Sequence, residues 1–294
     1  MVKYIKFMLL IIILCLLLPL LTLSGRVMEN NLKEFENESF DIIIQAGQSN
    51  AEGCGYGDTV CEYKPREDIL YLTDKNPLGW EGEKFKCNPE PALNIEAAKE
   101  RERQGKLGEF SLSFARKYLE EGCLQSDRKL LIIRAAEGGT SFSAGQWGMT
   151  DVLYLRMLKM IDAALALNKN NRIVGFLWHQ GESDAVNGLN PAVYQQNLTK
   201  LFTSVRERYN LPQMPIITGG FCDEWESQNH AICKPITDAI QAVCAEIGYA
   251  VYVQTADLKS NNQQIADGDT IHFSRDALYI LGERYFEAWE KVKD

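Results

Sequence analysis

Two residues at opposite ends of the chain could act as a nucleophile and its base, namely Ser49 and His272. Ser49 lies in the segment Gln45–Ala51, directly after a short apolar run. Gly47 permits a sharp turn there, which would place the Ser49 hydroxyl at a helix N-terminus, where backbone N–H groups can support a developing oxyanion. Taken alone, a serine in this setting more often caps a helix, so other motifs must decide its role.

The second group of reactive residues is Asp269–His272, ahead of the last predicted helix. Three-residue spacing can bring a carboxylate onto an imidazole across one turn, which is the acid–base half of a catalytic triad. The chain has three histidines, and His230 lies in a charged stretch with no strand before it. His179 and His272 are therefore the candidates, and His272 has an orienting carboxylate, Asp269, at suitable spacing.

Two further segments are rich in polar residues or glycine. Ala136–Ser141 contains paired glycines, which let a backbone N–H approach a ligand closely. His179–Asp184 contains an amide donor, an imidazole and two carboxylates within six residues. An alternative interpretation makes His179, Glu182 and Asp184 the metal ligands of a metal-assisted hydrolase, although no second ligand cluster accompanies them.

Each of these segments must be positioned by a predicted strand or helix. Short β-branched apolar runs, typical of buried parallel strands, occur at Asp41–Ala46, Leu130–Ala135, Ile173–Trp178, Pro215–Gly219 and Ala250–Thr255. Segments with helical periodicity alternate with them at Ser111–Glu121, Val152–Leu167, Pro191–Tyr209, Pro235–Ile247 and Asp276–Val292. This alternation predicts an α/β fold, a three-layer α/β/α sandwich around a mainly five-stranded parallel sheet. Ligand sites in such sheets form beyond the carboxyl ends of the strands, which is where the reactive segments fall.

The chain is expected to contain one catalytic domain, residues 40–294, after an N-terminal segment. Its 294 residues, 46% of them hydrophobic, suffice for one large core. Two lysines followed by an apolar run over Phe7–Leu23 predict a signal peptide or N-terminal membrane anchor over residues 1–25, with a linker over 26–39. The protein is therefore expected to be secreted or anchored on the outer side of the cell membrane.

Residues 53–106 show little sustained periodicity and predict a loop-rich insertion at the mouth of the sheet. Loops of this length in a compact domain are usually functional, so a role in contacting substrate is expected. Trp80 lies in this insertion, in a loop near the predicted site.

The cysteines indicate where disulfides could form, and the net charge indicates whether nucleic acid could be a partner. Export permits disulfides, and Cys54 with Cys61, or Cys222 with Cys233, lie on loop-like stretches where a bridge could close. The net charge is -9, and no cluster of lysine and arginine forms a basic face. A nucleic-acid partner is therefore not expected.

Four motifs together resemble one family of hydrolases. The motifs GQSNA, EGGTS, WHQGESD and DGDTIHF occur in the order found in the SGNH (GDSL-like) hydrolase superfamily. Within it, the chain is similar to the sialate O-acetylesterase-like group that includes the acetylxylan esterases of carbohydrate esterase family six. The resemblance extends from about Asp41 to the C-terminal helix and implies the flavodoxin-like fold of SGNH hydrolases. Gln-Ser-Asn replaces the Gly-Asp-Ser of the superfamily's name, as is common in this group.

The resemblance assigns roles to the polar residues. It implies Ser49 as nucleophile and His272 as general base. The oxyanion would receive hydrogen bonds from the N–H of Ser49, the N–H of Gly139 and the side-chain amide of Gln180. Asp269 would orient the imidazole, while Glu182, after Gln180 in the third motif, is a supporting or alternative carboxylate. The local spacing to His272 favours Asp269.

The implied reaction removes O-acetyl groups from a glycan, either acetylxylan or sialic acid, through an acyl-enzyme. The implied partner is thus an acetylated carbohydrate, and no metal or organic cofactor is required. A non-catalytic glycan-binding protein on the same fold is a further alternative. The intact set of Ser49, Gln180, Asp269 and His272 argues against it.

Overall fold

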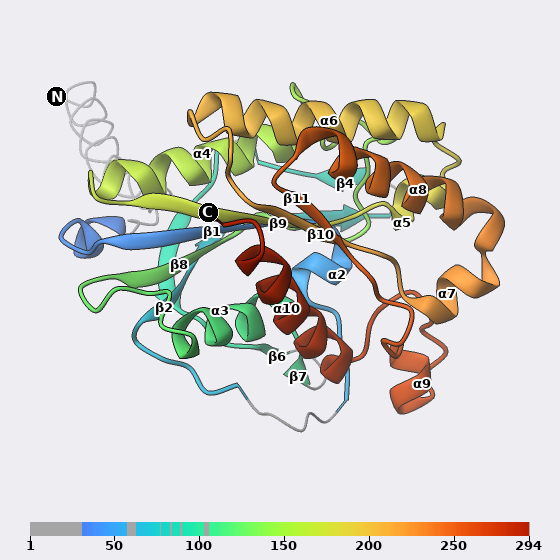
Figure 1. Ribbon diagram of the computed structural model, residues 1–294, viewed down its shortest axis with the longest axis horizontal. Helices are drawn as coiled ribbons and strands as arrows, with labels where there is room; N and C mark the ends of the chain where they lie inside the picture. Colours follow the sequence, from blue (N-terminus) through green and yellow to red (C-terminus); the bar gives the residue numbers. More distant parts are fainter. Residues whose placement is uncertain are drawn as a thin grey trace, which may run out of the picture.

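The computed structural model describes residues 31–293, except 58–62, 77, 83, 89 and 103–105. A sheet of seven strands lies at the centre, in the order β11-β10-β9-β1-β8-β2-β5 (Figure 1). The strands are β1 (Phe40–Gly47), β2 (Ile69–Asp74), β5 (Leu93–Ala97), β8 (Lys129–Arg134), β9 (Arg172–His179), β10 (Ile216–Gly219) and β11 (Ala250–Val253). Two short hairpins pair β3 (Gly79–Glu81) with β4 (Lys84–Lys86), and β6 (Arg101–Glu102) with β7 (Lys106–Leu107).

Helices cover both faces of the sheet. Those of the described residues are η1 (Leu32–Phe35), α2 (Ser49–Glu52), α3 (Phe110–Glu120), α4 (Val152–Leu167), α5 (Glu182–Val186), α6 (Pro191–Arg208), α7 (Asp223–Gln228), α8 (His230–Ile247), α9 (Asn261–Ile265) and α10 (Arg275–Glu290). Helices α4, α6 and α8 lie on one face, whereas α3 and α10 pack together on the other (Figure 1). The predicted three-layer α/β/α sandwich is confirmed.

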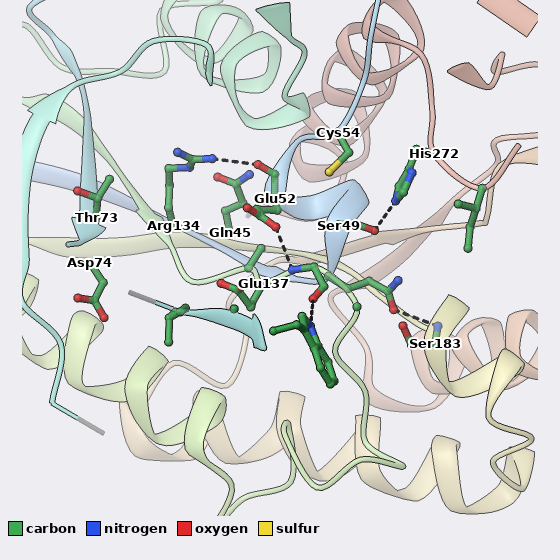
Figure 2. A pocket seen from close by; sticks show the side chains of 18 of the residues that line it. Gln45, Ser49, Glu52, Cys54, Thr73, Asp74, Arg134, Glu137, Ser183 and His272 are labelled. Carbon is green, nitrogen blue, oxygen red and sulfur yellow. Dashed lines mark hydrogen bonds between the residues drawn. The ribbon is translucent and has the colours of Figure 1, made fainter. Parts of the chain in front are cut away.

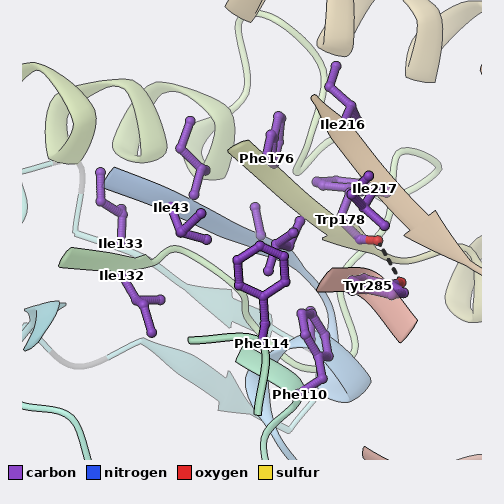
Figure 3. Packing of buried hydrophobic residues seen from close by; sticks show 14 of the residues in the cluster. Ile43, Phe110, Phe114, Ile132, Ile133, Phe176, Trp178, Ile216, Ile217 and Tyr285 are labelled. Atoms are coloured by element: carbon purple, nitrogen blue, oxygen red, sulfur yellow. Dashed lines mark hydrogen bonds between the residues drawn. The ribbon is translucent and has the colours of Figure 1, made fainter. Parts of the chain in front are cut away.

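Strand β1 is the middle of the sheet and is buried along its whole length. It pairs in parallel with β8 on one side and β9 on the other. Because helices cover both faces, successive side chains of these strands enter different apolar layers, as Ile132 and Ile133 of β8 do in Figure 3. Phe110 and Phe114 of α3 fill the layer on the α10 side (Figure 3). The core therefore holds the carboxyl ends of β1 and β9 in fixed positions.

The insertion at residues 53–106 differs from the expectation of loops alone. Its strand β2 pairs in parallel with β8, and β5 pairs antiparallel with β2, which extends the sheet from the predicted five strands to seven. Among the described residues between β2 and β5 there is no helix, so the alternation of strands and helices in the sequence gave no signal for these two strands. In β5, buried Leu93 and Ile95 alternate with more exposed neighbours, the pattern of a strand at a sheet edge.

Two further differences concern segment boundaries. Helix α8 begins at His230 and contains Pro235 in its interior, whereas the sequence placed Pro235 at the helix start. The predicted linker over residues 26–39 contains η1, and Asn31 exchanges two hydrogen bonds with the backbone of Ile95 in β5. The described part of this segment is therefore attached to the edge of the sheet.

Cys222 and Cys233, one of the two pairs for which the sequence left a disulfide open, are not joined. Both thiols are free and fully buried, Cys222 before α7 and Cys233 within α8, and burial raises the pKa of each to about 12. They act as small apolar core residues. The alternative pair, Cys54 with Cys61, cannot be compared because Cys61 lies outside the described residues.

The predicted signal peptide or anchor, residues 1–25, also lies outside the described residues. Within residues 31–293, with the gaps given above, no helix has the length and apolar character needed to cross a bilayer.

The amino end of β1 is tied to its neighbours by a buried carboxylate, Asp41. Asp41 accepts hydrogen bonds from Nε of Arg128 at 2.7 Å, Nε of Arg172 at 2.6 Å and the hydroxyl of Tyr118 at 2.7 Å. Burial alone would raise the pKa of Asp41, but these hydrogen bonds outweigh it and hold the pKa below its usual range. The ionised carboxylate therefore joins β1 to α3 and β9.

We expect Asp41→Asn to lower the free energy of unfolding at pH 7 by about 3 kcal/mol, because two guanidinium groups lose their anionic partner. Since the pKa of Asp41 is lowered on folding, its contribution is fully present above the unfolded pKa of about 3.9 and is lost as the pH falls through the folded pKa. Urea unfolding between pH 3 and pH 7 should therefore show a shallower acid dependence in Asp41→Asn. The exposed Asp127→Asn serves as control. An unchanged pH dependence in Asp41→Asn would contradict this account.

Candidate active site

Ser49, His272 and Asp269 form a continuous chain of hydrogen bonds. Nε2 of His272 lies 2.8 Å from Oγ of Ser49, and Nδ1 of His272 lies 2.8 Å from Oδ2 of Asp269. Figure 2 shows the Ser49 hydroxyl directed at the His272 ring. Because an ionised carboxylate only accepts hydrogen bonds, Nδ1 carries the proton and Nε2 is free to accept from the serine. The sequence predicted these three residues, and the structure brings them together.

The turn that presents Ser49 depends on Gly47. Gly47 has a φ of 130°, and a Cβ at this position would lie 2.0 Å from the carbonyl oxygen of His179. Only glycine permits this close approach of β1 to the end of β9. The N–H of Gln48 then donates to the same His179 carbonyl at 2.9 Å, and Ser49 begins α2. Ser49 is 8% exposed, so its hydroxyl is partly enclosed.

The loop that carries Asp269 and His272 is fixed by the start of α9. Nδ2 of Asn261 donates to Oδ2 of Asp269 at 3.0 Å, and the N–H of Asn261 donates to the carbonyl of His272 at 2.9 Å. Burial would raise the pKa of Asp269, but hydrogen bonds from His272 and Asn261 and the charge of the imidazolium hold the pKa below its usual range. Asp269 is therefore an ionised partner for His272 at neutral pH.

Asn50 connects the nucleophile to the histidine loop, a role that the sequence analysis missed. Its Oδ1 accepts from the N–H of Phe273 at 3.1 Å, and its Nδ2 donates to the carbonyl of Ile271 at 3.2 Å. Nδ2 also donates to Oε1 of Glu182 at 2.8 Å. Asn50 thus holds both neighbours of His272. The signal available in the sequence was a polar amide next to Ser49 in a segment expected to be buried.

Glu182 lies behind the site and contacts Asn50 rather than His272. It is fully buried, and burial raises its pKa. Its Oε2 has no hydrogen-bond partner within the described part of the chain, and its Oε1 lies 3.7 Å from Nε2 of His179. Burial lowers the pKa of His179 to about 3, so this imidazole is neutral. Of the two candidate carboxylates, Asp269 is the one that contacts the imidazole of His272.

Gln180, the predicted side-chain donor to the oxyanion, has protein partners for its amide. Its Nε2 donates to Oδ2 of Asp184 at 2.7 Å, and the same carboxylate accepts from the N–H groups of Phe142 and Ser143. The side chain of Gln180 is buried and does not line the cavity beside Ser49. In this geometry its amide connects α5 to the loop after β8.

The metal-ligand interpretation of His179, Glu182 and Asp184 is not supported. Nδ1 of His179 lies 2.9 Å from the hydroxyl of Tyr285, while Glu182 and Asp184 have the separate partners given above. Over the described residues, no three histidine, cysteine, aspartate or glutamate side chains are arranged to hold a metal ion. The three side chains therefore contact other parts of the protein, Tyr285, Asn50 and Gln180, and do not converge on one point.

A cavity of about 780 Å³ opens beside Ser49 and His272. Gly138 and Gly139, from the loop after β8, line the same cavity. Gly139 has a φ of 71°, and a Cβ there would lie 3.2 Å from Nε1 of Trp80, so this position also favours glycine. Gly139, the predicted oxyanion donor, and Ser49 thus line the same cavity.

The loop of Gly138 and Gly139 is held by Glu52, at the end of α2. Oε2 of Glu52 accepts from the N–H of Gly138 at 2.9 Å, as Figure 2 also shows. Because Ser49 and Glu52 belong to the same short helix, the glycine loop and the nucleophile are positioned together. The site as a whole contains a hydroxyl hydrogen-bonded to an imidazole, an ionised aspartate and a cavity large enough for a sugar residue.

Known proteins share this sequence pattern and fold. A family model described as carbohydrate esterase, sialic acid-specific acetylesterase, matches residues 39–291. A probable carbohydrate esterase of Arabidopsis thaliana is 31% identical over 108 residues, which is 34% of this chain and 40% of that protein. The alignment therefore spans less than half of that relative's length.

Three solved structures share the fold. The structure of NanS has a TM-score of 0.67 at 20% identity, covering 87% of this chain and 98% of its own. A protein from Arabidopsis thaliana has a TM-score of 0.65 at 21% identity, covering 85% of this chain and 98% of its own. A carbohydrate acetylesterase from Xanthomonas citri has a TM-score of 0.56 at 14% identity, covering 86% of this chain and 56% of its own. At these identities the likeness shows the fold.

The family match includes all four motifs, from the strand before Ser49 to the last helix. The resemblance to the sialate O-acetylesterase-like group, inferred from the motifs, is confirmed, and the three-layer fold is shared with NanS. Because the match extends over most of the chain, the protein belongs to the sialic acid-specific acetylesterase family of carbohydrate esterases.

Proposed function

We propose that this protein is a serine esterase that removes O-acetyl groups from a carbohydrate through an acyl-enzyme. The observation that carries the proposal is the hydrogen-bonded chain from Asp269 through His272 to Ser49, which borders a cavity of about 780 Å³. Membership of a carbohydrate esterase family gives the substrate class. NanS and the Xanthomonas citri acetylesterase support it as relatives in fold.

In the first half of the reaction, Oγ of Ser49 attacks the acetyl carbonyl carbon while Nε2 of His272 takes its proton. The tetrahedral oxyanion receives hydrogen bonds from the backbone N–H groups of Ser49 and Gly139. The C–O bond to the sugar then breaks, and the imidazolium returns its proton to the sugar oxygen. An acetyl ester of Ser49 remains.

In the second half, water attacks the acetyl-serine carbonyl and gives a proton to His272. Collapse of the second tetrahedral intermediate releases acetate and restores the Ser49 hydroxyl with the proton from the imidazolium. Asp269 stabilises the imidazolium in both halves because it is ionised and contacts Nδ1 at 2.8 Å. Asn50 fixes the position of the histidine loop relative to Ser49, because it is hydrogen-bonded to the backbone of both neighbours of His272.

We expect Ser49→Ala to lower acetate release from p-nitrophenyl acetate and acetylated xylan by about a thousandfold or more, because no other group can form the acyl-enzyme. Urea unfolding of the variant should match that of wild type, since the hydroxyl contributes little to packing. Equal acetate release by the two proteins would show that the serine mechanism is wrong.

Substitution of the two carboxylates should lower kcat to very different extents. Asp269→Asn should lower kcat by about a hundredfold to ten-thousandfold, because the imidazolium loses its anionic partner and the correct tautomer of His272 is no longer favoured. Glu182→Gln should lower kcat by less than about tenfold, since the new amide oxygen can still accept from Asn50. Both variants are compared by stopped-flow release of p-nitrophenol. If Glu182→Gln lost more activity than Asp269→Asn, Glu182 would be the partner of His272.

A further inference from the structure

We infer that Trp80 is a positioning residue for the oxyanion, because its indole holds the peptide group that carries the N–H of Gly139. This inference rests on the proposed function and adds a residue of the insertion to its active site. Trp80 lies on β3 and lines the same cavity as Ser49 and Gly139. Three features support the inference, namely the contacts of Gly138, the geometry of a trans peptide and the conformational freedom of paired glycines.

Both backbone polar groups of Gly138 are hydrogen-bonded to side chains. Its N–H donates to Oε2 of Glu52 at 2.9 Å, and its carbonyl accepts from Nε1 of Trp80 at 3.1 Å. Glu52 belongs to α2, the helix that begins at Ser49, whereas Trp80 belongs to the hairpin of β3 and β4. Gly138 is therefore held by two elements that lie far from it in the sequence.

The carbonyl of Gly138 and the N–H of Gly139 belong to one peptide group. This peptide is trans, and a trans peptide is planar, with its C=O and its N–H directed to opposite sides. A hydrogen bond that fixes the carbonyl of Gly138 therefore also fixes the direction of the N–H of Gly139. Among the described residues, no group accepts a hydrogen bond from this N–H. The proposed oxyanion donor is thus oriented through the other end of its own peptide.

A peptide between two glycines needs such a restraint. Neither residue carries a Cβ, so the peptide can rotate with little steric resistance. A rotated peptide would direct the carbonyl oxygen of Gly138 to the side where the N–H of Gly139 now points. An acceptor in that position would repel a developing oxyanion, which requires donors. Trp80 disfavours the rotation because the rotated carbonyl would lose its hydrogen bond to the indole.

The indole of Trp80 is itself held in place. Trp80 pairs with Phe85 across the hairpin, and the two ring centroids lie 5.3 Å apart. A Cβ at Gly139 would lie 3.2 Å from Nε1 of Trp80, so the glycine loop packs closely on the indole. Phe85 does not line the cavity beside Ser49. Substitution of Phe85 therefore disturbs the indole without removing a group that substrate can touch.

We expect Trp80→Phe to lower kcat for p-nitrophenyl acetate by about fivefold to tenfold, with KM within about twofold of wild type. Phenylalanine keeps an aromatic ring but lacks the N–H, and one hydrogen bond shifts an equilibrium by about this factor. The effect falls on kcat because the oxyanion exists only in the transition state. Active sites are counted with a fluorophosphonate that labels Ser49, so that kcat refers to active enzyme.

Trp289→Phe is the matched control. The indole of Trp289 also donates to a backbone carbonyl, that of Val174, at 2.7 Å, but this contact lies toward the amino end of β9. Trp289→Phe should lower the free energy of unfolding measured in urea and leave kcat within about twofold. An equal fall of kcat in both variants would assign the effect of Trp80 to general stability and overturn the inference.

Two further measurements test the route through the peptide. Phe85→Ala should lower kcat by about twofold to fivefold, and the double variant with Trp80→Phe should lose no more than Trp80→Phe alone, since Phe85 acts through the indole. The inhibition constant of methylboronic acid, whose adduct with a serine resembles the tetrahedral intermediate, should rise by the factor by which kcat falls. Fully additive losses would contradict the inference.

A loss in Trp80→Phe that is confined to acetylated xylan, with p-nitrophenyl acetate unchanged, would overturn the inference, because Trp80 would then contact the sugar instead of orienting the peptide. Ser49→Ala separates failure of the inference from failure of the proposed function. If acetate release from both substrates persists in Ser49→Ala, the proposed function itself is wrong. If release depends on Ser49 but Trp80→Phe has the kcat of wild type, only the role of Trp80 fails.

Discussion

The close approach of β1 and β9 at their carboxyl ends is the constraint on which the site depends. Gly47 and the carbonyl of His179 come so near that any side chain at position 47 would clash. This contact fixes where β1 turns into α2 and therefore where Ser49 lies. It also fixes where β9 turns toward Glu182, which lies within reach of Asn50. One backbone contact thus positions both the nucleophile and the group that supports the histidine loop.

Behind the site, the buried polar side chains of Glu182 and His179 help to position Asn50, although their burial costs free energy of folding. Glu182 and His179 are both fully buried, and each has a side-chain atom without a hydrogen-bond partner among the described residues. Burial raises the pKa of Glu182 and lowers that of His179, because burial disfavours the charged form of each group. Asn50 gains its fixed orientation from this cluster. The cluster therefore contributes to the geometry of the site more than to stability.

The sequence predicted the parts of the fold that follow a strong local pattern. The uniformly apolar strands β1, β8 and β9 and the helix α4 were found because burial on both faces, or an apolar stripe at helical spacing, is visible in the residues themselves. Strands β2 and β5 were missed, since β2 is defined by its pairing with β8, and β5 by its pairing with β2, rather than by their own composition. The start of α8 was missed because Pro235 suggested a helix boundary.

In the site, too, contacts between residues close in the sequence were predicted, whereas contacts between distant residues were not. The spacing of Asp269 and His272 is local, and their contact followed from it. The contact of Asn50 with Ile271 and Phe273 spans most of the chain, and nothing near Asn50 in the sequence specifies it. The orientation of Gln180 likewise depends on Asp184 and the loop after β8, which the motif alone does not place. Sequence reasoning identified the residue types, while their roles depended on packing.

This dependence on distant contacts links activity to the integrity of the whole domain. Ser49 belongs to the first strand–helix connection and His272 to a loop before the last helix, so their hydrogen bond closes only when the sheet and α10 are in place. The insertion adds Trp80 and Asp74 to the cavity wall from strands β3 and β2. Local unfolding at any of these elements separates groups that must act together. The site is therefore a product of the complete fold, and no single segment contains it.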